Sequence, residues 1–212
     1  GAQAGGEGHA RPDVAHKRII FNGNNYSEEW AKEAAKRVLL NLKSSDEALP
    51  YFKKQKNIDV FAKHGVLSAL EVESRTDIML ENYCKTVLIE AECMVDMAMK
   101  EIFPAVVKYS ACLAQSVTAK RAVSAELDED AETDVLKRLS AFGGEIKRRA
   151  DELDGLCAKA KGMCDHEALA HFCRREILAC MEKLRAAADG AERLTAKEYW
   201  PFPTYSELFF SV

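Results

Sequence analysis

Two cysteines and two histidines lie close together in the stretch CDHEALAHFC, residues 164–173. Thiolates and imidazoles are the ligands that structural zinc prefers, so Cys164, His166, His171 and Cys173 raise the hypothesis of a zinc site. Their spacing does not suit one ion on a helix. Cys164 and His171 share one face while His166 and Cys173 point elsewhere, and His166 and Cys173, seven residues apart, are too far from each other for one ion without a loop. The pattern favours surface histidines and packed cysteines, and a zinc or redox protein is the weakest alternative.

The acidic and basic residues outside this stretch do not have the spacing of a known catalytic or metal-binding motif. Glu90, Glu92 and Asp96 share one helical stretch, but a di-iron centre needs Glu-x-x-His pairs on two helices, and no histidine follows a glutamate at that spacing. Arg174 and Arg175 can attract an anion, but no glycine-rich loop accompanies them. The residues alone therefore predict no catalytic, cofactor-binding or metal-binding side chain.

Composition and charge narrow the class of protein. The 212 residues are 48% hydrophobic, enough for a sizeable core, and the net charge of −4 indicates neither nucleic acid nor a membrane surface as partner. No apolar run approaches the length of a membrane-spanning helix. The polar residues 1–17 are typical of a flexible linker. Seven cysteines, an odd number, indicate free thiols in a reducing compartment, the cytoplasm or an organelle stroma.

Six aromatic residues crowd into the stretch YWPFPTYSELFF, residues 199–210. Each proline restricts the residue before it to an extended conformation, so the preceding helix ends here and an extended aromatic tail follows. Burial of the rings would hold this tail, residues 198–212, on its own chain or on a neighbouring subunit. The expected docking residues are Trp200, Pro201, Phe202, Pro203, Tyr205 and Phe209, with Trp200, Phe202 and Tyr205 as the main anchors.

Short helices are expected over residues 18–66. Ser27 is a suitable N-cap for a helix that ends near residue 40. Ser44 and Glu47 have the spacing of a capping box and begin a second helix. A third short helix ends at Gly65, a residue that favours the left-handed turn after a helix.

The strongest helical signal begins at another capping box, Ser68 with Glu71, and continues to about Lys120. Apolar residues recur at intervals of three to five and define one inward face. The residues expected on that face are Ile78, Tyr83, Val87, Ala91, Met94, Ala98, Ile102, Ala105, Tyr109 and Leu113. Pro104 lies inside this run and predicts a kink, because its ring displaces a backbone hydrogen bond. The alternative is two helices that meet at Phe103–Pro104.

Two more long helices follow. The first begins near Ser124 and ends at Gly162, and the pair Gly143–Gly144 weakens its middle. Its apolar face is formed by Leu136, Leu139, Phe142, Ile146, Leu153 and Leu156. The second runs from about His166 to Lys197, after an N-cap at Asp165. Its apolar residues are Leu169, Phe172, Ile177, Ala188 and Leu194.

No segment makes a credible sheet, so the expected fold class is all-α. Three long helices joined by short links pack as an elongated antiparallel bundle, here residues 67–197. The expected organisation is therefore a linker (1–17), a short-helix region that joins a catalytic core (18–66), the bundle, and the aromatic docking tail (198–212).

Four stretches of the chain stand out, in this order: KRIIFNGNNYSEEWAKEAAKR, NLKSSDEALP, VESRTDIMLENYCKTVLIEAECMVDMAMKEIFPAVVKYS and MEKLRAAADGAERLTAKEYWPFPTYSELFFSV. Within them, the run ESR…LE.Y.K…IEA and the ending W-P-x-P-T-Y-x-[ED]-L are the most specific motifs. Together they resemble the C-terminal part of type III glutamine synthetases over nearly all of residues 17–212.

The resemblance implies a parent enzyme that makes glutamine from glutamate, ammonia and ATP with Mg or Mn, through γ-glutamyl phosphate, as a dodecamer of two hexameric rings. The family's metal-binding glutamates, loop histidine and phosphate-binding arginines lie in a preceding barrel, and no position here matches them. The chain is then expected to be a structural and assembly region, inactive in isolation, whose partners are the rest of its polypeptide and other subunits. The alternative is a free-standing helical interaction module without catalytic activity.

Overall fold

The computed structural model describes residues 21–203 and 205–210. Its contacts divide the chain into two compact units, Gly1–Lys43 and Ser44–Val212, which we describe separately. Every regular element in the described residues is helical, which confirms the all-α fold class. Of these described helices, none is long and apolar enough to cross a lipid bilayer.

The first unit contains one described helix, α2 (Glu28–Lys36). The Ser27 hydroxyl accepts a hydrogen bond from the Trp30 amide at 3.5 Å, which confirms Ser27 as the N-cap. The Phe21 ring packs on the Trp30 ring, with centroids 4.7 Å apart. The helix is shorter than predicted, because the backbone reverses at Val38.

The second unit begins with two short helices, α3 (Ser45–Phe52) and α4 (Gln55–Lys63). Ser44 is the N-cap of α3, but its side chain makes no capping hydrogen bond, so the predicted capping box is not formed. The Ser44 hydroxyl instead lies beside the carboxylate of Asp46. α4 ends at Gly65, as predicted.

α2 and α4 end in the same backbone motif with different central residues. After α4, the Gly65 amide donates to the Ala62 carbonyl and the following amide reaches back to Phe61, which is the pattern of a Schellman turn. After α2, Val38 occupies the equivalent position, with its amide donating to Ala35. The φ angles are 63° at Gly65 and 58° at Val38. This left-handed region suits glycine and is unfavourable for a β-branched side chain.

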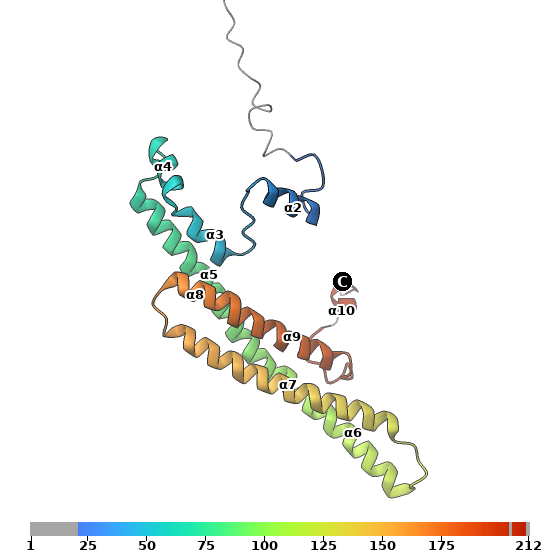
Figure 1. Ribbon diagram of the computed structural model, residues 1–212. Coiled ribbons are helices and arrows are strands. Elements are labelled where there is room, and N and C mark those ends of the chain that lie inside the picture. The colour runs from blue at the N-terminus through green and yellow to red at the C-terminus, as the bar shows by residue number, and fades with distance from the viewer. Residues whose placement is uncertain (1–20, 204, 211–212) are drawn as a thin grey trace, which may run out of the picture. The chain divides into compact units, whose positions relative to one another are not determined.

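One continuous helix covers residues 69–123 (Figure 1). It consists of α5 (Ala69–Met97), the π-helical segment η2 (Ala98–Ile102) and α6 (Phe103–Val123). The capping box at its start is confirmed: the Ser68 amide donates to the Glu71 carboxylate at 2.7 Å, and the Glu71 amide donates to the Ser68 hydroxyl at 3.3 Å. Pro104 lies in the first turn of α6, two residues after the end of η2, and this π-helical turn accommodates its missing amide. The kink at Pro104 stays a prediction.

The buried face of this helix differs from the prediction at its start. Ile78 is 52% exposed, and the buried positions on either side of it are Thr76 and Leu80. Thr76 can occupy the core because its hydroxyl donates to the Val72 carbonyl at 2.8 Å, which satisfies its polar group within the helix. The apolar character of Ile78 therefore did not decide its position.

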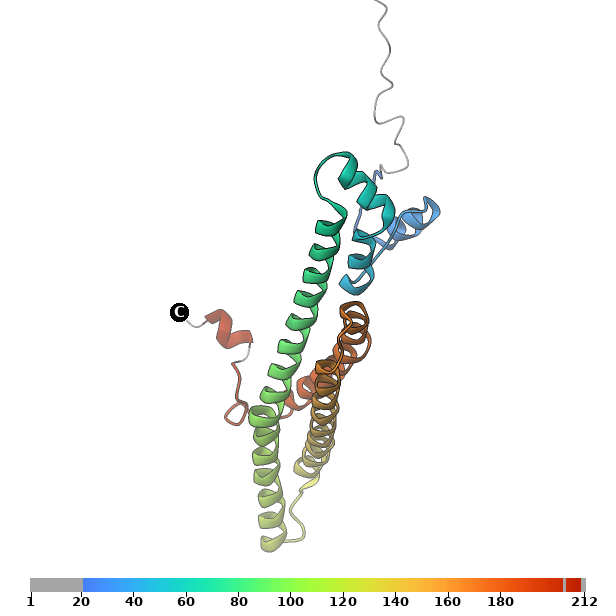
Figure 2. The same cartoon turned by 90° about the vertical axis from the view of Figure 1, so that its left-hand side faces the viewer.

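The remaining long helices pack against α5 and α6. α7 (Asp130–Lys161) runs back along α6 and α5, and its other side contacts α9 (Leu178–Glu192) (Figures 1 and 2). α9 is preceded without interruption by α8 (His166–Phe172) and the π-helical segment η3 (Cys173–Ile177). Asp165 is the predicted N-cap, accepting from the Ala168 amide at 2.8 Å. α9 ends before the predicted Lys197, because the chain tightens into turns after Glu192.

The buried residues of α7 form a regular seam. They alternate in steps of four and three, the spacing of a coiled-coil interface: Leu139, Gly143, Ile146, Ala150, Leu153, Cys157 and Ala160. Large and small side chains alternate along most of this seam, which lets neighbouring helices approach closely at the small ones. The glycine of α9 that faces this helix, Gly190, leaves no room for a Cβ beside the ring of Phe142.

The prediction of an extended tail is wrong for residues 205–210, which form the short helix α10 (Tyr205–Phe210). Residues 201–203 are not helical, as their two prolines require. No proline follows Pro203, so the backbone is free to form a helical turn again. Glu207 of α10 pairs with Lys197 at 2.6 Å.

We expect Val38→Gly to stabilise the chain by about 1 kcal/mol, because glycine removes the strain of a left-handed valine whose side chain is almost fully exposed. Gly65→Ala at the matching turn should destabilise it by about 1 kcal/mol. Urea unfolding of both variants measures this. Equal effects of the same sign would contradict the prediction.

Candidate functional site

The aromatic segment is the only stretch for which the sequence predicts specific contact residues. Trp200 and Phe202 are partly buried and pack against the core, with their rings in an edge-to-face arrangement 6.5 Å apart. Pro201 and Pro203 are exposed. Phe209 is 78% exposed, and the side chain of Tyr205 lies outside the described residues.

Trp200 and Phe202 form one wall of a groove of about 550 Å³ between α9 and the junction of α5 with η2. The groove is largely apolar and rich in methionine, whose flexible side chains adapt to irregular surfaces. Its main apolar lining residues are Met94, Met97, Ile102, Met181, Trp200 and Phe202. The charged residues Glu90, Arg185 and Asp189 also border it, and Arg185 lies 3.7 Å from Asp189.

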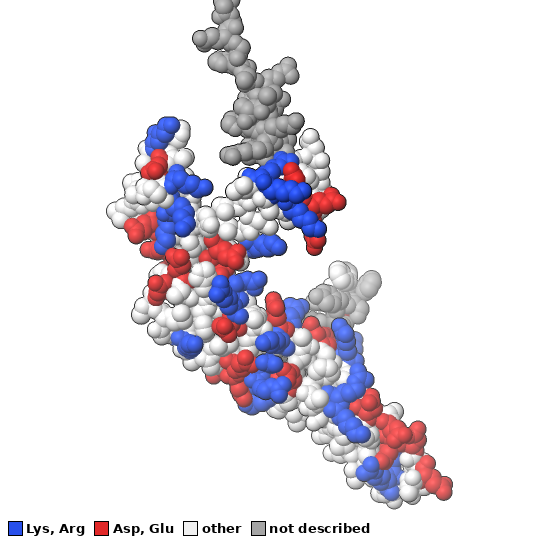
Figure 3. All heavy atoms as spheres, viewed as in Figure 1, with Lys and Arg blue, Asp and Glu red and all other residues white. Residues whose placement is uncertain are grey.

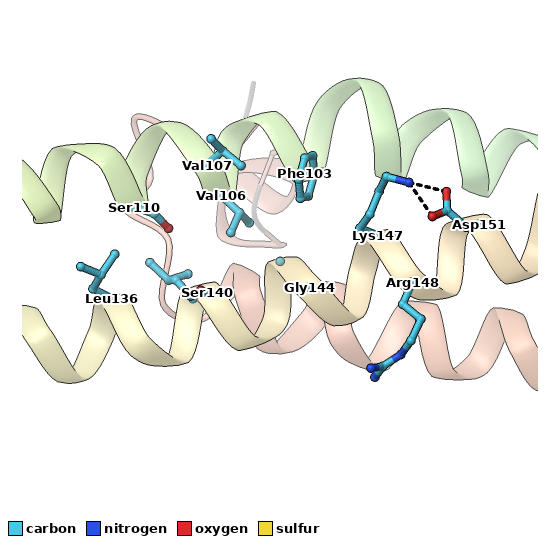
Figure 4. A pocket seen from close by; sticks show the side chains of 12 residues that line it. Phe103, Val106, Val107, Ser110, Leu136, Ser140, Gly144, Lys147, Arg148 and Asp151 are labelled. Atoms are coloured by element: carbon cyan, nitrogen blue, oxygen red, sulfur yellow. Dashed lines mark hydrogen bonds and ion pairs between the residues drawn. The ribbon is translucent and has the colours of Figure 1, made fainter.

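A second groove, of about 670 Å³, lies between α6 and α7 (Figure 4). The side chains of Phe103, Val106 and Val107 border it from α6. On α7, a Cβ added to Gly144 would meet nothing within 4 Å, so this part of the groove is open. At one end, the Lys147 ammonium lies 2.6 Å from a carboxylate oxygen of Asp151. The other polar side chains that line the groove are Ser110, Ser140 and Arg148.

A hydrogen bond between a buried carboxylate and a histidine joins α3 to α8. The Asp46 side chain is only 3% exposed, and its Oδ2 lies 2.8 Å from Nδ1 of His171. The other carboxylate oxygen, Oδ1, is buried without a hydrogen-bond partner among the described residues. The ring of His171 is partly exposed. This contact spans 125 residues of sequence and fixes α3 against the long helices.

The electrostatics favour the charged form of Asp46. Burial raises the pKa of its carboxyl, but the Ser44 hydroxyl and the His171 ring outweigh burial and hold the pKa below its usual range. Tyr83 of α5 is affected by the same group: burial, and then the charge of Asp46, raises the pKa of its phenol. Near neutral pH the Asp46 carboxyl is therefore ionised and the Tyr83 phenol is protonated. Groups that keep these states stabilise the fold and do not exchange protons with each other.

The cysteines are free thiols, and four of them belong to the core: Cys84, Cys157, Cys173 and Cys180. Burial raises the pKa of Cys173 to about 12, so its thiol is inert. Cys164, its partner in the zinc hypothesis, is exposed. Within residues 21–203 and 205–210, no three His, Cys, Asp or Glu side chains are grouped to hold a metal ion.

Sequence reasoning missed the pair Asp46–His171. Asp46 lies in the first turn of a helix, where an acidic residue is ordinarily explained by the helix dipole, and His171 belongs to the stretch that raises the zinc hypothesis. No spacing rule connects residues so far apart.

We expect Asp46→Asn to destabilise the chain by about 1–3 kcal/mol at neutral pH, because it removes a charged partner from a buried hydrogen bond. The folded pKa of Asp46 is lowered, so its contribution is present above about pH 4 and is lost as the pH falls through the folded value. The difference between variant and parent should therefore shrink in acid. Urea unfolding between pH 7 and pH 3 measures it.

Asp189→Asn is the matched control, because Asp189 forms an exposed ion pair with Arg185. It should change the free energy of unfolding by less than about 0.5 kcal/mol. A destabilisation by Asp46→Asn that is constant from pH 7 to pH 3 would contradict the role assigned to the charge.

Comparison with known proteins identifies the family. Residues 13–121 match the family model of the glutamine synthetase C-terminal domain. The chain is 38% identical over 202 residues to a glutamine synthetase of Butyrivibrio fibrisolvens, covering 94% of this chain and 28% of that protein. It is 29% identical over 201 residues to a type-3 glutamine synthetase of Dictyostelium discoideum, covering 93% of this chain and 27% of that protein.

The same region matches a glutamine synthetase of Bacteroides fragilis at 27% identity, over 93% of this chain and 28% of that protein. The chain thus spans little more than a quarter of the length of these relatives. The family match runs from the first unit to the last turn of α6, the part of the chain that carries the two capped helix starts at Ser27 and Ser68. The chain belongs to the glutamine synthetase C-terminal domain family.

Proposed function

We propose that this chain is the C-terminal structural and assembly region of a type III glutamine synthetase. The observation that carries the proposal is the family match over residues 13–121 together with the type-3 relative, which aligns with nearly the whole chain. Because the chain spans about 28% of the relatives' length, the larger part of such an enzyme is a separate region of the polypeptide.

The parent enzyme makes glutamine from glutamate, ammonia and ATP through γ-glutamyl phosphate, with Mg or Mn. The ligands for ATP and metal come from the rest of the polypeptide, and this segment is inactive in isolation. The environment of Asp46 supports a structural role, since its carboxylate is buried and hydrogen-bonded to His171 on another helix of the same unit.

The segment is organised as a linker (1–17), a joining region (18–66), an antiparallel bundle of three long helices (67–197) and an aromatic docking tail (198–212). Packing of α7 on α6 and α9 supports the bundle. Partial burial of Trp200 and Phe202 against the core supports docking of the tail on its own chain. The exposed side chain of Phe209 is then available to a neighbouring subunit.

The partners are the catalytic region of the same polypeptide and other subunits of a homo-oligomer, a dodecamer by family resemblance. Positive and negative side chains are interspersed over the face seen in Figure 3, which suits protein contacts better than nucleic acid. All seven cysteines are free, which supports a reducing compartment such as the cytoplasm. The alternative function is a free-standing helical scaffold module, favoured only by the lack of catalytic side chains.

We expect Trp200→Ala to lower the free energy of unfolding by about 2–3 kcal/mol, less than for a fully buried tryptophan, because the ring is partly exposed. Phe209→Ala, an exposed aromatic of the same tail, is the matched control and should change it by less than about 0.5 kcal/mol. Thermal and urea unfolding of this chain measure both. Unchanged stability of Trp200→Ala would rule out the docked tail.

The assembly role is tested in the whole enzyme, with ATP-dependent glutamine formation and sedimentation velocity measured on the same samples. Removal of the region equivalent to residues 67–212 should abolish the oligomer and reduce activity with it. A shortened enzyme that keeps both its oligomer and its activity would overturn the proposed function.

A further inference from the structure

An uncharged stripe runs along the exposed face of α5. Its six members are Ile78, Asn82, Thr86, Ile89, Cys93 and Met97, and all six are exposed. Their spacing of four, four, three, four and four residues places them on one side of the helix. The three largest side chains are 52%, 62% and 43% exposed at Ile78, Ile89 and Met97.

The opposite face of α5 is already buried in the second unit. α3, α7 and α8 contact it, and Figure 2 shows α8 and α9 along one side of α5. A helix on the surface of a monomer normally carries charged residues on its outer face. On α5 such residues occur only at the ends of the stripe, at Arg75 and Lys100, and along its flanks. The stripe therefore has the composition of an interface.

We propose that this stripe is a contact between two copies of the chain, formed by α5 helices that pack antiparallel about a two-fold axis. The intervals between the six stripe residues are the same whether they are counted from Ile78 or from Met97. If the helices cross between residues 87 and 88, Ile78 lies opposite Met97 of the second copy, Asn82 opposite Cys93, and Thr86 opposite Ile89. A two-fold contact requires such a self-complementary surface, whereas contact with an unrelated partner does not.

The size of the stripe suits a weak but specific contact. It extends about 28 Å along the helix. Two helices packed over that length bury about 1,000 Å², near the lower limit for a specific interface. We therefore expect a weak contact, with a Kd of about 1–100 μM. Asn82, the most polar member, is the kind of residue that fixes the register of paired helices. In this register Arg75 lies opposite Lys100 of the second copy. Lys100 is paired with Asp96 at 2.6 Å, which offsets part of the repulsion between these two ends.

This contact is a specific form of the assembly role proposed above, and the inference rests on that proposed function. Its test needs no glutamine synthesis, so the two proposals can fail separately. A monomeric chain would overturn the α5 contact and leave the result with the whole enzyme unaffected.

The experiment is sedimentation equilibrium of the chain at concentrations from about 5 to 200 μM, a range that brackets micromolar affinity. We expect a monomer–dimer equilibrium for the parent chain. Ile89→Lys should weaken it at least about tenfold, because the two-fold axis introduces the charge twice into an apolar contact. Leu70→Lys is the matched control: Leu70 is also exposed on α5, at 74%, but lies outside the stripe.

Circular dichroism must show the same helix content for both variants, and Ile78→Lys replaces Ile89→Lys if the latter is unfolded. A parent chain that stays monomeric overturns the proposal. It is also overturned if the stripe variant dimerises like the parent, or if Leu70→Lys weakens the dimer equally.

The orientation has its own test. Asn82→Cys places a thiol opposite the partner's Cys93, at the separation of two packed helices, about 8–10 Å. A short bismaleimide should then join two copies covalently, and the further change Cys93→Ser should prevent it. In the parent chain the two Cys93 thiols are separated by about 16 Å along the helices and should not be joined. Equal cross-linking of all three proteins would contradict the antiparallel arrangement.

Discussion

The seam of α7 is the constraint on which the second unit depends. α7 contacts α5, α6 and α9, so its small residues set how closely three helices can approach. Where Gly143 and Ala150 interrupt the larger Leu139 and Ile146, neighbouring side chains fill the space and the packing stays dense. The core cysteines serve the same purpose as small apolar residues, which is why their thiols are buried and unreactive.

In the part of the chain that the structure describes, each of the three buried polar side chains has a hydrogen-bond partner, although Oδ1 of Asp46 has none. Thr76 and Thr195 donate to backbone carbonyls of their own helices, and Asp46 is paired with His171 of α8. Of these three side chains, only Asp46 connects parts of the chain that are distant in sequence. It positions α3, the first helix of the second unit, against α5 and α8 at a place where a charge without a partner would be strongly destabilising.

The described helices offer exposed apolar surfaces for protein contacts. In the described residues four of the thiols are buried in the core and Asp46 is hydrogen-bonded to His171, whereas apolar side chains remain exposed along α5 and on α10. Membership of the glutamine synthetase C-terminal domain family fits this division, since the chain matches only about 28% of its relatives' length. Contacts with the remainder of the enzyme and with other copies would cover the surfaces that are exposed here.

Local rules determined much of this protein from its sequence: the all-α class, the caps at Ser27, Ser68 and Asp165, and the turn at Gly65. These features depend on residues within four positions of one another, where hydrogen-bond geometry leaves few choices. Tertiary structure alone decided that Thr76 is buried while Ile78 is exposed, and that Asp46 meets His171. Those outcomes depend on which face of a helix its neighbours cover, and the free energy of that choice is shared among residues far apart in the chain.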